Sequence, residues 1–199
     1  MTTLLALCGL GYSLLALWSA RDFAHRKRGT GVAQPVSILK PVKGVDARMY
    51  AGFVSHCKQQ YAGEYEILFG VSDLADPAVA MIHRLQTEFP KQAIRLIECT
   101  QRLGTSGKVS NLVQMIPQAR FKHYIVNDSD ILVSPQYLTR VMAEFGGDKV
   151  GMVTVPYIGH AGERASERTV WSKLESLGIA TDFFAGVLYL FDFSKKDKK

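Results

Sequence analysis

The sequence predicts an α/β domain, with a mostly parallel β-sheet flanked by helices, that follows one membrane-spanning helix. The domain is predicted because strand-like and helix-like segments alternate about four times after residue 34. The membrane helix is predicted because Thr2–Ala20 is a largely apolar run without a charge. A chain of 199 residues is long enough for one such domain with its own core and an anchor.

The N-terminal run, residues 2–20, is interpreted as a membrane anchor. As a helix it would be roughly 28 Å long, close to the hydrocarbon thickness of a bilayer. A cleaved signal peptide is the alternative, but such peptides normally begin with basic residues and have a shorter apolar core. Here the basic residues follow the run, within Arg21–Arg28, and positive charge favours the cytoplasmic side. We therefore expect a single-pass anchor, a basic juxtamembrane linker over 21–34 and a cytoplasmic domain.

The net charge of +6 is concentrated in two short segments, Arg21–Arg28 and Lys195–Lys199. Without them the chain has 16 basic and 16 acidic residues, so the body of the protein is neutral. A protein that binds nucleic acid would need a basic face on the domain itself. The composition therefore predicts no nucleic-acid partner, and residues 191–199 are interpreted as a solvated charged tail.

The first half of the domain shows two strands, each followed by a helix. Residues 35–41 are a short β-rich run closed by proline, and Tyr65–Val71 is a continuous apolar run typical of a buried strand. Between them, residues 47–60 place apolar side chains at helical spacing. Asp76 and Pro77 then open a helix that extends to about Phe89, with proline at its first position.

The second half continues the alternation. Residues 94–99 alternate as a third strand, and residues 106–119 are predicted to be helical. The apolar side chains expected on one face of that helix are Val109, Leu112, Val113 and Ile116. A fourth strand is expected over 124–127, a helix from Ser134 and Pro135 to Phe145, and a fifth strand over 150–155.

Two carboxylates, Asp128 and Asp130, directly follow the fourth predicted strand. Ligands of open parallel sheets bind beyond the carboxyl ends of the strands. Two carboxylates at such a place can share a divalent cation, which in turn can hold a diphosphate. The alternative for an isolated Asp-x-Asp is a turn stabilised by an aspartate side chain.

Other candidates lie at neighbouring ends of the same sheet. Asp73 follows the strand 65–71 and could hold a nucleotide by hydrogen bonds, whereas Asp76 is better explained as the N-cap of the next helix. Lys108 and Asn111 begin another helix, where phosphate binding is favoured. A solvated lysine and a capping asparagine are the alternative for that pair.

Six segments carry a family resemblance. Along the chain they are SILKPVKG, YEILFGVSDLADP, GKVSNLVQMIPQA, NDSDILVSPQYL, VGMVTVPY and WSKLESLGIATDFFAGVLYL. In order and spacing they resemble the ceramide glucosyltransferase-like enzymes, whose relatives include the bacterial hopanoid-biosynthesis glycosyltransferases. The resemblance covers about Pro35–Leu190 and implies a GT-A fold, which is Rossmann-like, over 35–190.

The resemblance also implies an activity: inverting transfer of a sugar, glucose in the first instance, from a UDP-sugar to a membrane lipid such as ceramide. It implies a divalent metal, Mn²⁺ or Mg²⁺, held by Asp128 and Asp130. Asp73 matches the family's first aspartate, at the nucleotide, and Asp128 its second. Lys108 and Asn111 match the KVSNL block of the donor site.

The chain departs from the family after residue 190. A third aspartate, expected to be the catalytic base, and a QxxRW-type motif have no match in residues 191–199. We therefore expect an incomplete catalytic domain that binds the donor but transfers little sugar, with the base left unassigned. Two alternatives stay open: a hopanoid N-acetylglucosaminyltransferase that uses UDP-GlcNAc, and an inactive membrane-tethered remnant.

Overall fold

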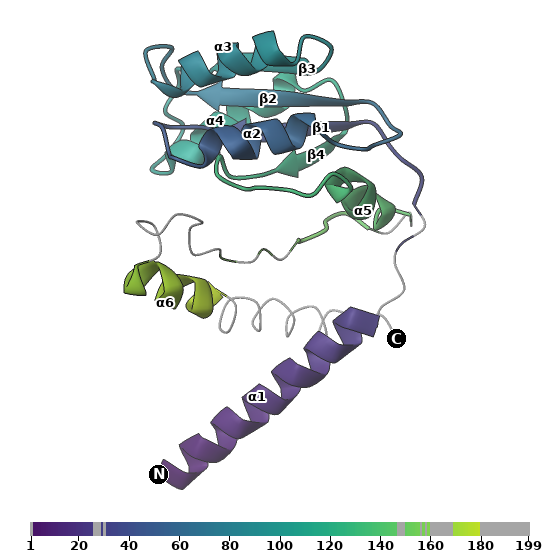
Figure 1. The fold of residues 1–199 in the computed structure, drawn as a ribbon, viewed down its shortest axis with the longest axis vertical. Coiled ribbons are helices and arrows are strands. Elements are labelled where there is room, and N and C mark those ends of the chain that lie inside the picture. The colour runs from purple at the N-terminus through teal and green to yellow at the C-terminus, as the bar shows by residue number, and fades with distance from the viewer. Residues whose placement is uncertain are drawn as a thin grey trace. The chain divides into compact units, whose positions relative to one another are not determined.

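The computed structural model describes residues 2–25, 29, 31–146, 150–155, 157, 159 and 169–179 (Figure 1). The chain divides into two compact units, one formed by residues 29–151 and the other by residues 1–28 with 152–199. The end of the expected catalytic domain, residues 180–190, and the expected charged tail, residues 191–199, lie outside the described part.

The unit 29–151 is built on a sheet of four parallel strands. These are β1 (Val36–Pro41), β2 (Tyr65–Val71), β3 (Ala93–Glu98) and β4 (His123–Val126). Their spatial order is β3-β2-β1-β4, and all neighbours are parallel. Val36 of β1 lies opposite Tyr65 on one side and His123 on the other, so β1 is central. The four strands confirm the predicted mostly parallel sheet.

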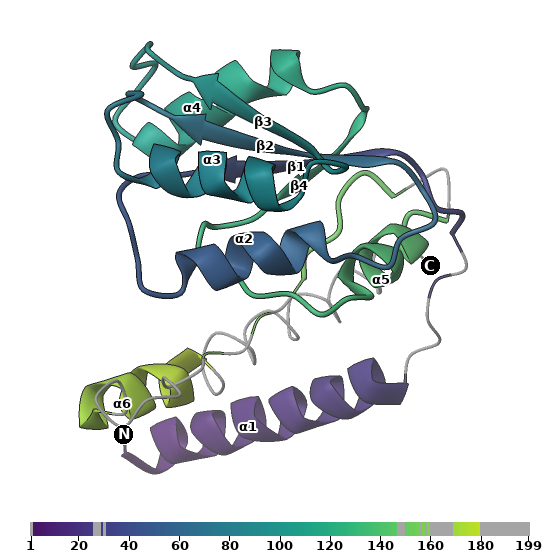
Figure 2. The same ribbon diagram turned by 45° about the horizontal axis from the view of Figure 1, so that its top comes forward.

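Helices cover both faces of this sheet (Figure 2). On one face lie α2 (Met49–Cys57), α3 (Ala78–Glu88) and α5 (Tyr137–Ala143), whose apolar side chains share a core with Ile38, Ile67 and Phe69. On the other face α4 (Gly107–Met115), continued by the 3₁₀ turn η1 (Ile116–Gln118), packs Met115 against Leu39 and Leu68. Alternate residues of β1 and β2 therefore belong to two separate cores.

Two features of the predicted elements differ in the structure. Of the four apolar side chains predicted on one face of the helix 106–119, three are exposed, Val109 at 56%, Val113 at 48% and Ile116 at 41%, whereas Leu112 is partly buried. The helix buries Ser110, Asn111 and Met115 instead. Residues 150–155, expected as a fifth strand, are described without strand structure. A β-rich run becomes a strand only where a neighbour shares its hydrogen bonds, and intrinsic preference does not supply that neighbour.

The other unit contains two described helices, α1 (Thr2–His25) and α6 (Val170–Gly178). Helix α1 has 24 residues and is long and apolar enough to cross a membrane. Its leucine side chains are exposed, which fits a helix whose partner is lipid rather than a protein core. The helix extends beyond the predicted anchor, residues 2–20, into the first residues of the expected linker.

Candidate active site

The candidate site lies where the chain has crossed from one face of the sheet to the other. Helices α2 and α3 lie on one face, whereas α4, which leads into β4, lies on the other. The strand order therefore reverses at β1, with β2 and β3 on one side of it and β4 on the other. In open α/β sheets such a switch point is where ligands bind. The segment after β4, residues 127–134, is called the acidic loop below.

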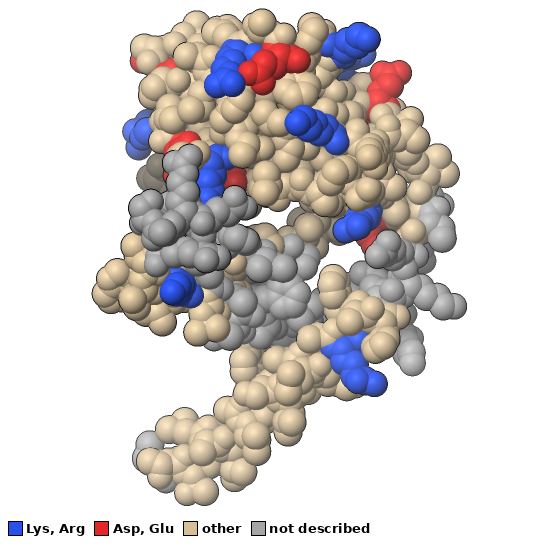
Figure 3. All heavy atoms as spheres, in the orientation of Figure 1, with Lys and Arg blue, Asp and Glu red and all other residues tan. Residues whose placement is uncertain are grey.

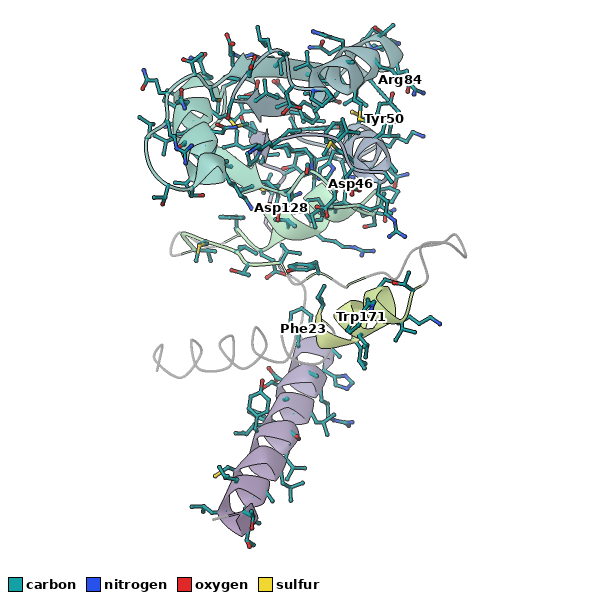
Figure 4. All side chains as sticks on the ribbon, turned by 90° about the vertical axis from the view of Figure 1, so that its left-hand side faces the viewer. Phe23, Asp46, Tyr50, Arg84, Asp128 and Trp171 are labelled. Atoms are coloured by element: carbon teal, nitrogen blue, oxygen red, sulfur yellow. The ribbon has the colours of Figure 1, made fainter. Side chains whose placement is uncertain are left out.

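The acidic loop presents both candidate carboxylates to solvent. Asp128 and Asp130 are exposed, and Figure 4 labels Asp128 on this loop. The Nζ of Lys108, at the start of α4, forms an ion pair with Oδ1 of Asp128. Both side chains are about half exposed, at 50% and 56%. The structure thus brings together Lys108 and Asp128, which are 20 positions apart in the sequence.

A residue that the sequence analysis missed lies beneath this loop. Lys40 of β1 is fully buried, and its Nζ donates a hydrogen bond of 2.8 Å to the backbone oxygen of Asp128. Burial lowers the pKa of Lys40 to about 7, against the opposing effect of the Asp128 and Asp130 charges. A lysine inside an otherwise apolar strand was the available signal, because lysine is rarely buried without a partner.

The aspartates after β2 have different roles. Asp76 accepts hydrogen bonds from the backbone N–H of Ala78 and, at 2.9 Å, from that of Gly44. It therefore caps α3, as predicted, and also ties the loop after β1 to the loop after β2. Asp73 is exposed and accepts a 2.8 Å bond from the N–H of Ala75. Asp73 therefore stabilises a local turn, and its place at the nucleotide stays a prediction.

Asn111 is a buried residue of α4. It is 4% exposed, its Nδ2 donates to the carbonyl oxygen of Gly70, and its Oδ1 accepts from Oγ of Ser72. The N-cap of α4 is Ser106, whose side chain accepts the N–H of Val109. The alternative of a capping asparagine was therefore wrong: Asn111 joins α4 to the end of β2, immediately before Asp73.

The oxygen donors of the acidic loop fit a divalent cation that is shared with a bound phosphate. Magnesium and manganese prefer oxygen ligands, and magnesium is commonly held by one or two carboxylates together with substrate phosphates and water. Asp128 and Asp130 supply two such carboxylates. Among the described residues, no three His, Cys, Asp or Glu side chains form a group that could hold a metal by themselves.

The charged side chains of the domain are mixed in sign. On the face drawn in Figure 3, Lys and Arg side chains lie among Asp and Glu side chains. The pair of Arg84 and Tyr50, with the guanidinium 4.4 Å from the ring centroid, lies on α3 and α2 and is labelled in Figure 4.

The sequence model of glycosyl transferase family 21 matches residues 1–190. Ceramide glucosyltransferase 3 of Caenorhabditis elegans is 28% identical over 167 residues, which is 79% of this chain and 36% of that protein. Beta-monoglucosyldiacylglycerol synthase of Trichormus variabilis is 27% identical over 147 residues, which is 73% of this chain and 31% of that protein. The chain thus spans about a third of the length of these relatives.

A solved structure shares the fold. The mannosyltransferase PcManGT from Pyrobaculum calidifontis, solved in complex with GDP-Man and Mn²⁺, superposes with a TM-score of 0.58 at 20% identity. The match covers 77% of this chain and 46% of that chain. Together with the parallel sheet flanked by helices, this similarity confirms the predicted GT-A fold.

Proposed function

Because the chain belongs to glycosyl transferase family 21, we propose that it binds a UDP-sugar, with glucose as the first candidate, for transfer to a membrane lipid. The observation that carries the proposal is the pairing of Lys108 with Asp128 at the switch point between β1 and β4. At such a place the ammonium group of Lys108 can contact a diphosphate, and the carboxylate of Asp128 can bind the metal ion that accompanies it. The names of the relatives support glucose as the sugar and a lipid as the acceptor.

The donor site that we propose combines three places on this edge of the sheet. Asp73 would accept hydrogen bonds from the nucleoside, and Lys108 would leave Asp128 to contact the diphosphate. Asn111, being buried, would serve the donor by holding the segment that leads to Asp73. Each role follows from the exposure and partners of the residue, and each is separately testable.

Asp128 and Asp130 are the residues that would hold the divalent cation. When bound, the cation would neutralise the negative charge of the departing nucleoside diphosphate. The buried Lys40 would hold the backbone of Asp128, and the α4 N-terminus would add a partial positive charge near the phosphates. Among the described residues we assign none as the base that activates the acceptor hydroxyl for inverting attack.

A lipid acceptor fits the N-terminal part of the chain. Helix α1 is long and apolar enough to serve as an anchor, and the basic cluster after residue 20 favours a cytoplasmic domain. An anchored domain meets membrane lipids at high local concentration and nucleotide-sugars from the cytoplasm. By their names, one relative glucosylates ceramide and the other makes a glucosylated diacylglycerol. Both names support a lipid alcohol as the acceptor.

The test is calorimetric titration of UDP-glucose into the full chain in lipid nanodiscs, with and without Mn²⁺. Asp130→Asn removes one proposed ligand charge, and Glu64→Gln is the matched control, because Glu64 is also exposed but precedes β2 at the opposite edge of the sheet. We expect Mn²⁺-dependent binding in the wild type and in Glu64→Gln, and its loss in Asp130→Asn. Binding that survives in Asp130→Asn would contradict the assignment of the site.

The same titration separates the remaining candidates. Competition with UDP-GlcNAc reports the sugar, since tighter binding of that nucleotide would favour the hopanoid type of enzyme. A folded wild-type protein that binds neither nucleotide would indicate an inactive remnant and would overturn the proposal.

A further inference from the structure

We propose that a hydrogen-bonded framework from α2, α5 and β1 holds the acidic loop in its binding geometry. Its members are Lys40, Ser55, His56 and Tyr137. They contact the loop on both sides of the two carboxylates and from beneath, without being candidates for ligand contact themselves. The inference rests on the proposed function of Asp128 and Asp130 and names the residues that position them.

The first contact lies immediately before Asp128. The hydroxyl of Tyr137 donates to Oδ1 of Asn127 at 3.2 Å, and Nδ2 of Asn127 lies 2.9 Å from Nε2 of His56. Nδ1 of His56 lies 2.7 Å from the carbonyl oxygen of Gly52, which can only accept. Nδ1 therefore carries the proton, Nε2 accepts from Asn127, and all three bonds run in one direction from α5 to α2.

The second contact lies after Asp130. Oγ of Ser55 accepts the N–H of Val133 at 3.1 Å and donates to the carbonyl oxygen of Gly52 at 2.7 Å. One turn further along the chain, Nε2 of Gln59 donates to the carbonyl oxygen of Ser134 at 2.9 Å. Ser55 near the end of α2 and Gln59 just after the helix therefore hold the end of the loop, while His56 holds its beginning.

The third contact supports the middle of the loop. Lys40 donates to the backbone oxygen of Asp128, and the N–H of Asn127 donates to the carbonyl oxygen of Leu39 at 3.2 Å. Helix α2 also approaches the loop directly, because a Cβ at Gly52 would lie 3.0 Å from the carbonyl oxygen of Ile131. The backbone around both carboxylates is thus fixed at several points within the domain.

The framework residues position the acidic loop and do not contact a ligand themselves. Lys40 and His56, for example, are fully buried and bond to the loop backbone or to Asn127. Outer-shell hydrogen bonds of this kind orient the groups that hold a metal or ligand. Loss of one such bond should enlarge the range of loop conformations and weaken binding by about two- to tenfold, the usual effect of one hydrogen bond.

The test compares two tyrosine variants of the full chain in nanodiscs. Tyr137→Phe removes only the hydroxyl that bonds Asn127, whereas Tyr65→Phe, the control, removes a hydroxyl that bonds the carbonyl oxygen of Cys57. Both tyrosines are half-buried and pack on the same core. Ser55→Ala tests the far end of the loop in the same way.

Three readouts distinguish positioning from general stability: hydrogen exchange of residues 127–134 in metal-free protein, Mn²⁺ affinity in the presence of UDP, and Tm. We expect Tyr137→Phe and Ser55→Ala to exchange faster in this segment and to bind Mn²⁺ about two- to tenfold more weakly than Tyr65→Phe at similar Tm. Equal exchange in Tyr137→Phe and Tyr65→Phe would overturn the inference. Absence of Mn²⁺ and UDP binding in wild type would instead refute the proposed function, while hydrogen exchange still decides whether the framework holds the loop.

Discussion

Gly52 offers a sensitive test of the contact between helix α2 and the acidic loop. In Gly52→Ala the new Cβ would lie 3.0 Å from the carbonyl oxygen of Ile131 and 3.2 Å from that of Ser129. Ordinary contacts of a Cβ begin at 3.4 Å, so the loop must move away by a few tenths of an ångström. Because Asp130 lies between these two residues, its carboxylate must move with them.

Two energies of opposite sign determine the stability of Gly52→Ala. Alanine in place of a helical glycine stabilises by about 0.5–1 kcal/mol, and an overpacked contact costs about 1–3 kcal/mol. The free energy of unfolding should therefore fall by no more than about 2.5 kcal/mol. Donor affinity should fall by about three- to tenfold, because misplacement of binding groups by a fraction of an ångström is costly.

The assay is Mn²⁺-dependent UDP-glucose binding together with thermal unfolding. Ala51→Gly is the matched control, because Ala51 is exposed on the same helix and its loss weakens the helix by about 0.5–1 kcal/mol without touching the loop. We expect Ala51→Gly to lower Tm and keep its affinity, and Gly52→Ala to show the larger loss of affinity. Equal affinity in Gly52→Ala and wild type would refute the reasoning that the close approach fixes the carboxylates.

Three further predictions concern charged and titratable side chains. Lys108→Met should change the free energy of unfolding by less than about 1 kcal/mol, since the ion pair of Lys108 is half exposed. In competition assays the same variant should lose more affinity for UDP than for uridine. Burial lowers the pKa of His56 to about 3, and the Lys40 charge acts in the same direction. The contribution of the neutral His56 to the free energy of unfolding is therefore fully present above pH 6.5 and is lost as the pH falls toward 3. In urea titrations, the free energy of unfolding should fall by up to about 1.4 kcal/mol for each pH unit in this range, and this dependence on pH should be weaker in His56→Gln. Glu66→Leu should cost about 1–3 kcal/mol in the same urea titrations without affecting donor binding, because it removes the buried carboxylate oxygen that accepts from Oγ of Ser37 and the N–H of Arg120.

Periodicity in the sequence predicted the sheet and most helices because their burial follows from local pattern. The run Tyr65–Val71 is buried almost throughout as β2, as a continuous apolar segment in a parallel sheet should be. The position of Asp128 and Asp130 at a strand end was also predictable, because β4 directly precedes them. Nothing local, however, states which strand lies beside which, so the juxtaposition of Lys108 and Asp128 required the structure.

The orientation of α4 shows where pattern fails. The apolar face predicted for this helix includes Val109, Val113 and Ile116, and these three side chains are exposed in the structure. The helix instead turns Met115 toward Gly70, where the lack of a side chain leaves it room, and Asn111 toward the carbonyl oxygen of the same glycine. A single hydrogen-bonded asparagine and one glycine partner thus outweighed the apolar stripe, and both effects depend on tertiary contacts.

The central place of β1 has a consequence for synthesis of the chain. β1 is made first, yet its second neighbour, β4, is the last of the four described strands to leave the ribosome. Until then one side of β1 exposes unpaired backbone groups, which can pair with any other extended chain. Pairing between distant segments is also slow. A nascent chain stopped before residue 123 would therefore hold an unfinished sheet, and we expect translation past β4 to be the point at which it becomes resistant to protease.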